Sequence, residues 1–168
     1  CSILTQSDSL SAGKALAREL AAPDLKAALV FSDGLQTNGS QLIAALNQNL
    51  PSSVIIIGGL AGDSQSFTHT WVMANQLPQG QMACARGFYG ERIRVQSAVR
   101  AGWNSFGPER KVTLANGNKL YTLDNRPALE LYKQYLGKHA NNITKTSLHF
   151  PLAIRPKGKP YTLIRTPM

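Results

Sequence analysis

The sequence has few cysteines and no long apolar run. Its 168 residues include two cysteines, Cys1 and Cys84, which make no disulfide framework and no pair with metal-ligand spacing. No run reaches the roughly 18 apolar residues that a membrane-spanning helix needs. The low cysteine content fits a reducing compartment, so we expect a cytoplasmic protein without a membrane partner.

Acidic residues are also scarce, since nine Asp and Glu stand against 18 Lys and Arg and leave a formal net charge of +9. Such an excess can indicate a nucleic acid or an anionic surface as partner. The basic residues are scattered through strand-like segments, however, and only residues 155–159 are dense in them. We interpret the charge as a solvated basic surface with a basic hairpin turn. Nucleic-acid binding through that turn is an alternative that we do not favour.

The first part of the chain alternates between strand and helix patterns. With 43% apolar residues, the chain has the composition of a globular protein with a core. Residues 1–6 suggest a short strand, and residues 27–31 and 54–57 are continuous apolar runs typical of doubly buried strands. Between them, apolar residues recur at helical spacing over 10–21 and 40–50. This order predicts a short parallel β-α-β-α-β unit.

The later part of the chain is dominated by strand patterns. Strands are expected over residues 67–74, 81–89 and 92–101, and the Asn116-Gly117 pair predicts a tight hairpin over 111–123. A helix is expected from Pro127 to Gly137, a loop over 138–147, and a final strand pair over 149–154 and 161–165. The predicted fold class is therefore mixed, between α/β and α+β, with the parallel unit followed by an antiparallel meander and a further helix.

A glycine-rich turn, Gly58-Gly59-Leu60-Ala61-Gly62-Asp63, follows the second buried strand. Glycines let a ligand approach the backbone and let amides converge on an anion, and Asp63 could receive a ligand ammonium. The spacing matches neither the dinucleotide fingerprint nor a P-loop. A tight crossover that needs glycine only for its geometry is the alternative interpretation.

Aromatic and basic residues later in the chain could complete a pocket. Trp71, Trp103 and Phe106 could line a cavity for a small organic molecule, and Arg100 or Arg165 could pair its carboxylate. Ordinary core aromatics and surface arginines are the alternative. The predicted ligand-binding residues are Gly58, Gly59, Gly62, Asp63, Trp103 and Arg165.

The histidines and Cys1 support weaker alternatives. His69 alternates with Phe67 and Trp71, so we interpret it as a core histidine on one side of a strand. His69 or His149 could instead hold a haem iron, although we expect no resident cofactor and no metal. Cys1 would be an amino-terminal nucleophile of a hydrolase if it were the natural terminus. Because the chain begins without Met, we expect trimmed boundaries, and we predict a protein that is not an enzyme.

Several segments together resemble the FIST sensory domain (the F-box and intracellular signal transduction family). They are ALVFSDG at 28–34, IIIGGLAGD at 55–63 and GWNSFGPERKVTLANGNKLYTLDNRPALELYKQYLG at 102–137. HFPLAIRPKGKPYTLIR at 149–165 is similar to the start of the carboxyl-terminal FIST half. The resemblance implies an amino-terminal FIST domain over 1–147 and a truncated carboxyl-terminal one over 148–168.

The resemblance also implies a function. FIST domains are signal-input modules of bacteria, archaea and eukaryotes that are proposed to bind small molecules, amino acids among them. One branch is a haem protein that senses nitric oxide with a histidine kinase. Gly58, Gly59, Gly62 and Asp63 match the family's glycine-acid turn, and Trp103 and Gly107 match its tryptophan-glycine stretch. We therefore expect a small-ligand sensor that works with a signalling protein such as a histidine kinase.

Overall fold

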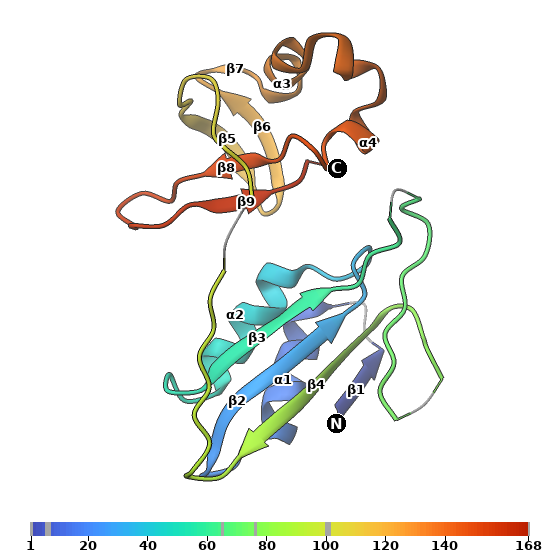
Figure 1. Ribbon diagram of the computed structural model, residues 1–168, viewed down its shortest axis with the longest axis vertical. Helices are drawn as coiled ribbons and strands as arrows, with labels where there is room; N and C mark the ends of the chain where they lie inside the picture. The colour runs from blue at the N-terminus through green and yellow to red at the C-terminus, as the bar shows by residue number, and fades with distance from the viewer. Residues whose placement is uncertain (1, 6–7, 65, 76, 100–101, 168) are drawn as a thin grey trace. The chain divides into compact units, whose positions relative to one another are not determined.

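The structure is a computed structural model that describes residues 2–5, 8–64, 66–75, 77–99 and 102–167. The chain divides into two compact units, unit 1 (residues 1–99) and unit 2 (residues 100–168), coloured from blue to yellow-green and from yellow to red in Figure 1. Each unit has its own sheet and helices, so each is described by itself.

Unit 1 is built on a four-stranded sheet with the strand order β1-β4-β2-β3. The strands are β1 (Ser2–Thr5), β2 (Leu25–Ser32), β3 (Ile55–Leu60) and β4 (Met82–Tyr89). β2 and β3 are parallel, whereas β4 is antiparallel to both β1 and β2. The predicted mixed fold class is confirmed. The three strands of the β-α-β-α-β unit run in one direction, but β4 inserts between β1 and β2.

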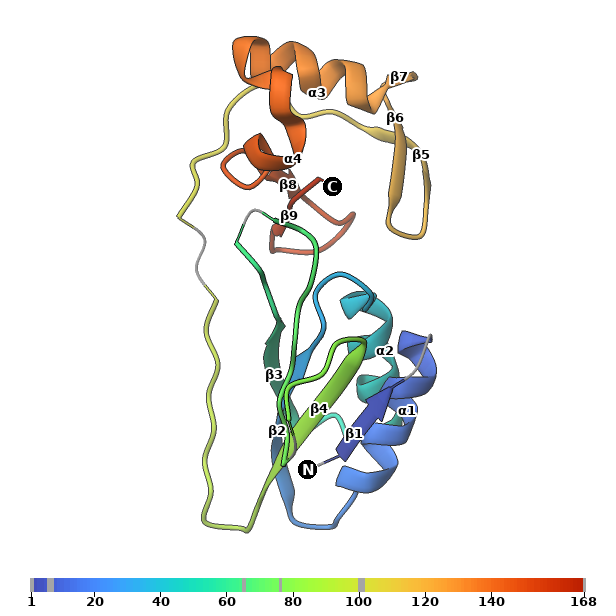
Figure 2. The same cartoon turned by 90° about the vertical axis from the view of Figure 1, so that its right-hand side faces the viewer.

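Helices α1 (Ser9–Leu20) and α2 (Gly39–Asn49) both cover one face of this sheet, as Figure 2 shows. Each helix begins at a polar cap. The Asp8 carboxylate accepts from the Leu10 and Ser11 amides, and the Asn38 side chain accepts from the Gln41 amide. Apolar residues at helical spacing and alternate strand residues form the core between helices and sheet. Its members include Leu16, Leu20, Ala28, Val30, Leu42, Leu46, Ala83 and Ala85.

A long loop, residues 61–81, covers part of the opposite sheet face. Val72 and Ala74 of this loop pack with Met82 and Cys84. The strand predicted over 67–74 is wrong, because the described part of this loop has only an isolated bridge between Val72 and Gln79. Phe67 has a φ of 51°, which is incompatible with an extended strand.

The strand predicted over residues 92–101 is also wrong for its described part. Residues 92–99 alternate apolar and polar residues but belong to no strand. Alternation makes a segment suitable for a sheet surface, but a strand also needs a hydrogen-bonded neighbour. Among the described residues this segment has none.

Unit 2 contains a three-stranded antiparallel sheet of β5 (Val112–Asn116), β6 (Lys119–Leu123) and β7 (Arg126–Pro127). The predicted hairpin is confirmed, with Gly117 at a φ of 56° in its turn. Helix α3 (Ala128–Leu136) begins after Pro127 and ends at Gly137, as predicted. The strand pair β8 (Leu152–Ile154) and β9 (Leu163–Arg165) is also confirmed.

The loop predicted over residues 138–147 is wrong. The 3-10 helix η1 (Gly137–Asn142) and the short helix α4 (Ile143–Thr146) occupy this stretch. The Asn142 side chain caps α4 by accepting from the Lys145 amide at 3.3 Å. Polar composition suggested a loop, but Asn is a favoured cap residue, and local capping decides in favour of a helical turn.

Candidate ligand site at the carboxyl ends of β2 and β3

Half of the predicted glycine turn belongs to a strand. Gly58 and Gly59 lie in β3 and pair with Val30 and Phe31 of β2. The chain leaves the sheet only at Ala61, whose amide donates to the Ser32 carbonyl at 2.8 Å. No helix follows this turn within unit 1 in the described residues, so the arrangement differs from a nucleotide-binding β-α unit, as the sequence predicted.

The glycines at the end of β3 serve different purposes. A Cβ at Gly58 would lie 1.7 Å from the Val30 carbonyl oxygen, and one at Gly34 would lie 2.0 Å from the Ala61 carbonyl oxygen. These two glycines are required by close backbone packing. By contrast, a Cβ at Gly59 or Gly62 would meet nothing within 4 Å, so the backbone at these two positions is open to approach.

Asp63 organises the loop that follows β3. Its Oδ1 accepts from the Phe67 amide at 3.0 Å, and its Oδ2 accepts from the Thr68 amide at 2.6 Å and the His69 amide at 3.1 Å. These bonds, that of Thr68 foremost, lower the pKa of the Asp63 carboxyl. Most of its acceptor capacity is therefore used by the loop. The ammonium-binding role predicted for Asp63 stays a prediction.

Asp33, which was not among the predicted ligand-binding residues, is buried at the end of β2. Its Oδ1 accepts from the Leu35 and Gln36 amides, and its Oδ2 accepts from the Gln81 amide at 3.0 Å. Burial favours the neutral form, but the three backbone hydrogen bonds outweigh it and the pKa of Asp33 is lowered. The only sequence signal was Ser-Asp-Gly directly after an apolar strand.

Thr70 adds a second link across the same edge of the sheet. Its Oγ1 accepts from the Gly34 amide at 3.0 Å. Together, Asp33 and Thr70 join two stretches of chain: the loop after β2 and the loop 61–81, which ends at the residue before β4. Distant segments of the chain therefore meet at the carboxyl ends of two adjacent parallel strands.

This edge of the sheet also has two energetically unfavourable features, a buried hydroxyl without a partner among the described residues and residues with positive φ angles. The Ser32 side-chain hydroxyl is fully buried and has no hydrogen-bond partner in the described part of the chain. Four non-glycine residues nearby have positive φ angles, namely Ser64, Phe67, Asn75 and Gln81. Unsatisfied buried groups and strained backbone are concentrated at functional sites in proteins. They therefore mark this edge as the candidate site.

The remaining predicted site residues lie elsewhere. Trp103 and Arg165 belong to unit 2, where the Trp103 side chain is 52% exposed and Arg165 ends β9. Phe106, also in unit 2, is exposed and meets Phe150 edge to face. Arg100 lies outside the described residues. The predicted ligand role of Trp103 and Arg165 stays a prediction.

The core role expected for His69 is wrong. His69 is exposed, and its ring stacks on the exposed Trp71 with a centroid distance of 6.0 Å. The loop around Asp63 replaces the expected strand and turns both rings to solvent. His149 is exposed as well, so neither histidine has the apolar enclosure that a haem ligand requires. Cys1 lies outside the described residues.

Other site types find no support within the part of the chain that the structure describes. No cluster of three His, Cys, Asp or Glu side chains is placed to hold a metal ion there. No helix among these residues is long and apolar enough to cross a bilayer. A shallow open hollow is lined by residues 89–93, at the far end of β4 from Asp33.

The comparison with known protein families covers unit 1 and part of unit 2. The sequence model of the FIST N domain matches residues 2–126, which include the unit 1 sheet, its helices and loops, and the β5–β6 hairpin. The chain belongs to the FIST N domain family. FIST domains are sensory domains of signal transduction and are not known as a family of enzymes. No curated protein and no solved structure matches the chain. The predicted FIST boundary at residues 147 and 148 stays a prediction.

Proposed function

We propose that this FIST chain is a small-ligand sensor, and that the loops at the carboxyl ends of β2 and β3 bind a free amino acid. The observation that carries the proposal is the meeting of two loops, the one after β2 and the loop 61–81, at Asp33 and Thr70, next to the open backbone at Gly59 and Gly62. Open sheets of the α/β type bind ligands beyond the carboxyl ends of their parallel strands. The geometry therefore favours this edge over any other part of unit 1.

The chemistry of the edge suits a zwitterion. Backbone amides around Gly62 can donate to an α-carboxylate, since the absence of a side chain lets the ligand come close. Asp33 and Asp63 both have lowered pKa values, so they are ionised at neutral pH and favour a nearby ammonium. A small ligand with one group of each sign fits both features.

The same contacts supply a route from binding to signalling. The loop 61–81 is held at one end by Asp63 and at the other by the bond from the Gln81 amide to Asp33. A ligand that binds more tightly to one arrangement of this loop shifts the population toward that arrangement. A signalling protein that contacts the exposed residues of the loop would read the shift.

Isothermal titration of the full chain against a panel of amino acids tests the proposal. We expect at least one member to bind, and we expect Gly62→Val to weaken its binding about tenfold or more, because the side chain would occupy the ligand's approach. Ser53→Val is the matched control, since it places the same side chain at an exposed position before the other end of β3. Flat titrations for the whole panel, or equal losses in both variants, would contradict the proposal.

A further inference from the structure

The charge of the chain is divided unequally between the two units. Twelve of the 18 Lys and Arg, but only three of the nine Asp and Glu, lie in residues 100–168. The first 99 residues contain six of each sign. Unit 1 is therefore neutral, and the whole net charge of +9 belongs to unit 2. The basic residues, which we interpreted as scattered along the chain, are concentrated in unit 2.

Two of the three acidic residues in unit 2 are already paired. Asp124 lies 3.2 Å from Arg110, and Glu109 lies 2.6 Å from Arg155. These are the ion pairs in the described part of unit 2. Among the described residues of unit 2, the other cations, which we call the surplus cations, have no carboxylate of that unit within ion-pair distance. They are Lys111, Lys119, Arg126, Lys133, Lys138, Lys145, Lys157, Lys159 and Arg165.

The β5–β6 hairpin presents an exposed apolar face within this basic unit. Val112, Leu114 and Tyr121 are 47%, 55% and 46% exposed. The Thr113 and Thr122 hydroxyls meet at 2.7 Å, and the register of the two strands shifts on both sides of Leu114. The three apolar residues therefore share their exposure on one hairpin and not a strict alternation. We call Val112, Leu114 and Tyr121 the hairpin face. Lys111 precedes β5 and Lys119 opens β6, which sets cations at both ends of this face.

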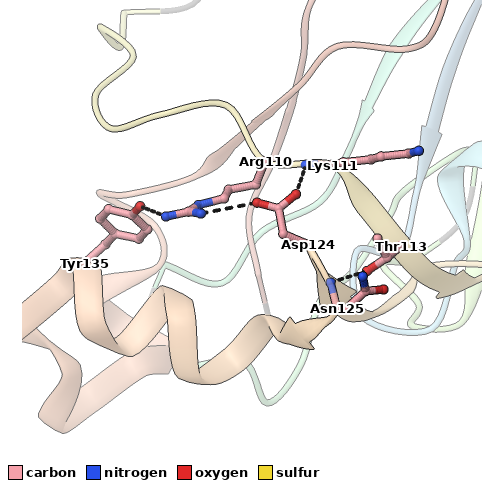
Figure 3. Close-up of polar contacts among 6 residues, drawn as sticks. All are labelled: Arg110, Lys111, Thr113, Asp124, Asn125 and Tyr135. Atoms are coloured by element: carbon pink, nitrogen blue, oxygen red, sulfur yellow. Dashed lines mark hydrogen bonds and ion pairs between the residues drawn. The ribbon is translucent and has the colours of Figure 1, made fainter.

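β5 is also an edge strand, and its pairing with β6 has register shifts on both sides of Leu114. It has a neighbour on one side only in the described part of the unit 2 sheet, and all five of its residues are exposed. Figure 3 shows how its start is held: the Asp124 carboxylate accepts from the Lys111 amide at 2.9 Å, and Thr113 Oγ1 accepts from the Asn125 amide. Arg110 joins Asp124 to Tyr135 of α3. The free main-chain groups of such an edge are a template for another strand.

We propose that β5 binds an extended acidic segment of a partner protein as an added strand. Main-chain hydrogen bonds would give affinity, apolar side chains would cover the hairpin face, and carboxylates would meet the surplus cations. A second copy of the chain is disfavoured as the partner, because its unit 2 would have the same charge of +9 and the two copies would repel each other. Aliphatic side chains beside a strand edge match a peptide better than a phosphate backbone. The proposal goes beyond the ligand site of unit 1 and does not depend on it.

Fluorescence anisotropy on the full chain tests this docking surface. The probe is a labelled synthetic peptide of alternating valine and glutamate that is long enough to span β5. Its binding is compared with that of two peptides, valine–lysine and valine–serine, and with that of a thymidine oligonucleotide of the same net charge as the probe. We expect the valine–glutamate peptide to bind most tightly and to lose affinity as salt is added.

Matched variants locate the binding. Leu114→Ser and Lys119→Glu should each weaken the binding of the valine–glutamate peptide about tenfold. Ile43→Ser and Lys14→Glu, at exposed positions of the unit 1 helices, should leave binding unchanged. Circular dichroism checks that every variant keeps its fold. Absence of peptide binding, equal effects of the control pair, or tighter binding of the oligonucleotide would overturn the proposal.

Discussion

Asp33 is the residue on which the candidate site depends most. Its carboxylate accepts from three backbone amides in two separate loops, so it fixes the positions of the residues after β2 and before β4. Because these bonds favour the ionised form, the pKa of Asp33 in the folded protein lies below its usual value of 3.8. The stabilisation is thus fully present above that usual value and is lost as the pH falls through the folded pKa.

We predict that Asp33→Ala lowers the free energy of unfolding at pH 7 by about 1–3 kcal/mol, because three part-buried hydrogen bonds lose their acceptor. We also predict that the variant loses less stability than the wild type between pH 7 and pH 3, since it lacks one of the groups that gain a proton. Urea denaturation at the two pH values measures both effects. An unchanged dependence on pH would show that Asp33 does not carry the effect.

The adjacent glycines of β3 offer a contrast at the same scale. A side chain at Gly58 would strike the Val30 backbone, whereas one at Gly59 would meet open space. We predict that Gly58→Ala destabilises the protein by about 1–3 kcal/mol and that Gly59→Ala changes the free energy of unfolding by less than about 0.5 kcal/mol. Chemical denaturation of both variants decides the matter, and equal effects would contradict the assignment of β3 to this register.

At the scale of single elements, local rules account for several of the predicted features, although the helical turn that Asn142 caps was missed. Asp8 and Asn38 cap the helices of unit 1, Gly117 makes the hairpin turn and Gly137 ends α3. These features depend on neighbours in sequence. The spacing of apolar residues, which is also a local pattern, distinguishes α1 and α2 from the strands β2 and β3.

The candidate site was less predictable because its parts come from distant segments. The glycine turn was found, but Gly58 could not be distinguished from Gly62, since the Val30 carbonyl that excludes a side chain belongs to another strand. Asp33 was missed because its partner Gln81 lies far along the chain. Residues 67–74 of the loop 61–81 were predicted as a strand because apolar alternation does not reveal that Asp63 accepts hydrogen bonds from the Phe67 and Thr68 amides.

The loop 61–81 yields a prediction of its own. Asp63→Ala should speed hydrogen exchange at the Phe67, Thr68 and His69 amides, which lose their acceptor, while exchange in α1 and α2 stays unchanged. Mass spectrometry or NMR follows the exchange. Asp24→Ala, an exposed acid of the same unit, serves as the control. Faster exchange across both helices would instead indicate that Asp63 supports the whole unit.

At the scale of the whole molecule, the two units differ in charge and in surface. Unit 1 is neutral and contains the strained, hydrogen-bonded loops at the carboxyl ends of β2 and β3, whereas unit 2 has the entire net charge of +9 and an exposed strand edge. Membership of the FIST N domain family makes the chain a sensory domain. We infer a division of labour in which unit 1 recognises the ligand and unit 2 contacts an acidic partner.

The position of the bound ligand tests this account most directly. Backbone amide shifts of the full chain, measured by NMR while the best-binding amino acid is added, should change first at Gly34, Gly62 and the residues next to them. The β8–β9 pair and α3 should stay unperturbed. Changes centred instead on the hollow at residues 89–93, or on unit 2, would contradict a ligand site at the carboxyl ends of β2 and β3.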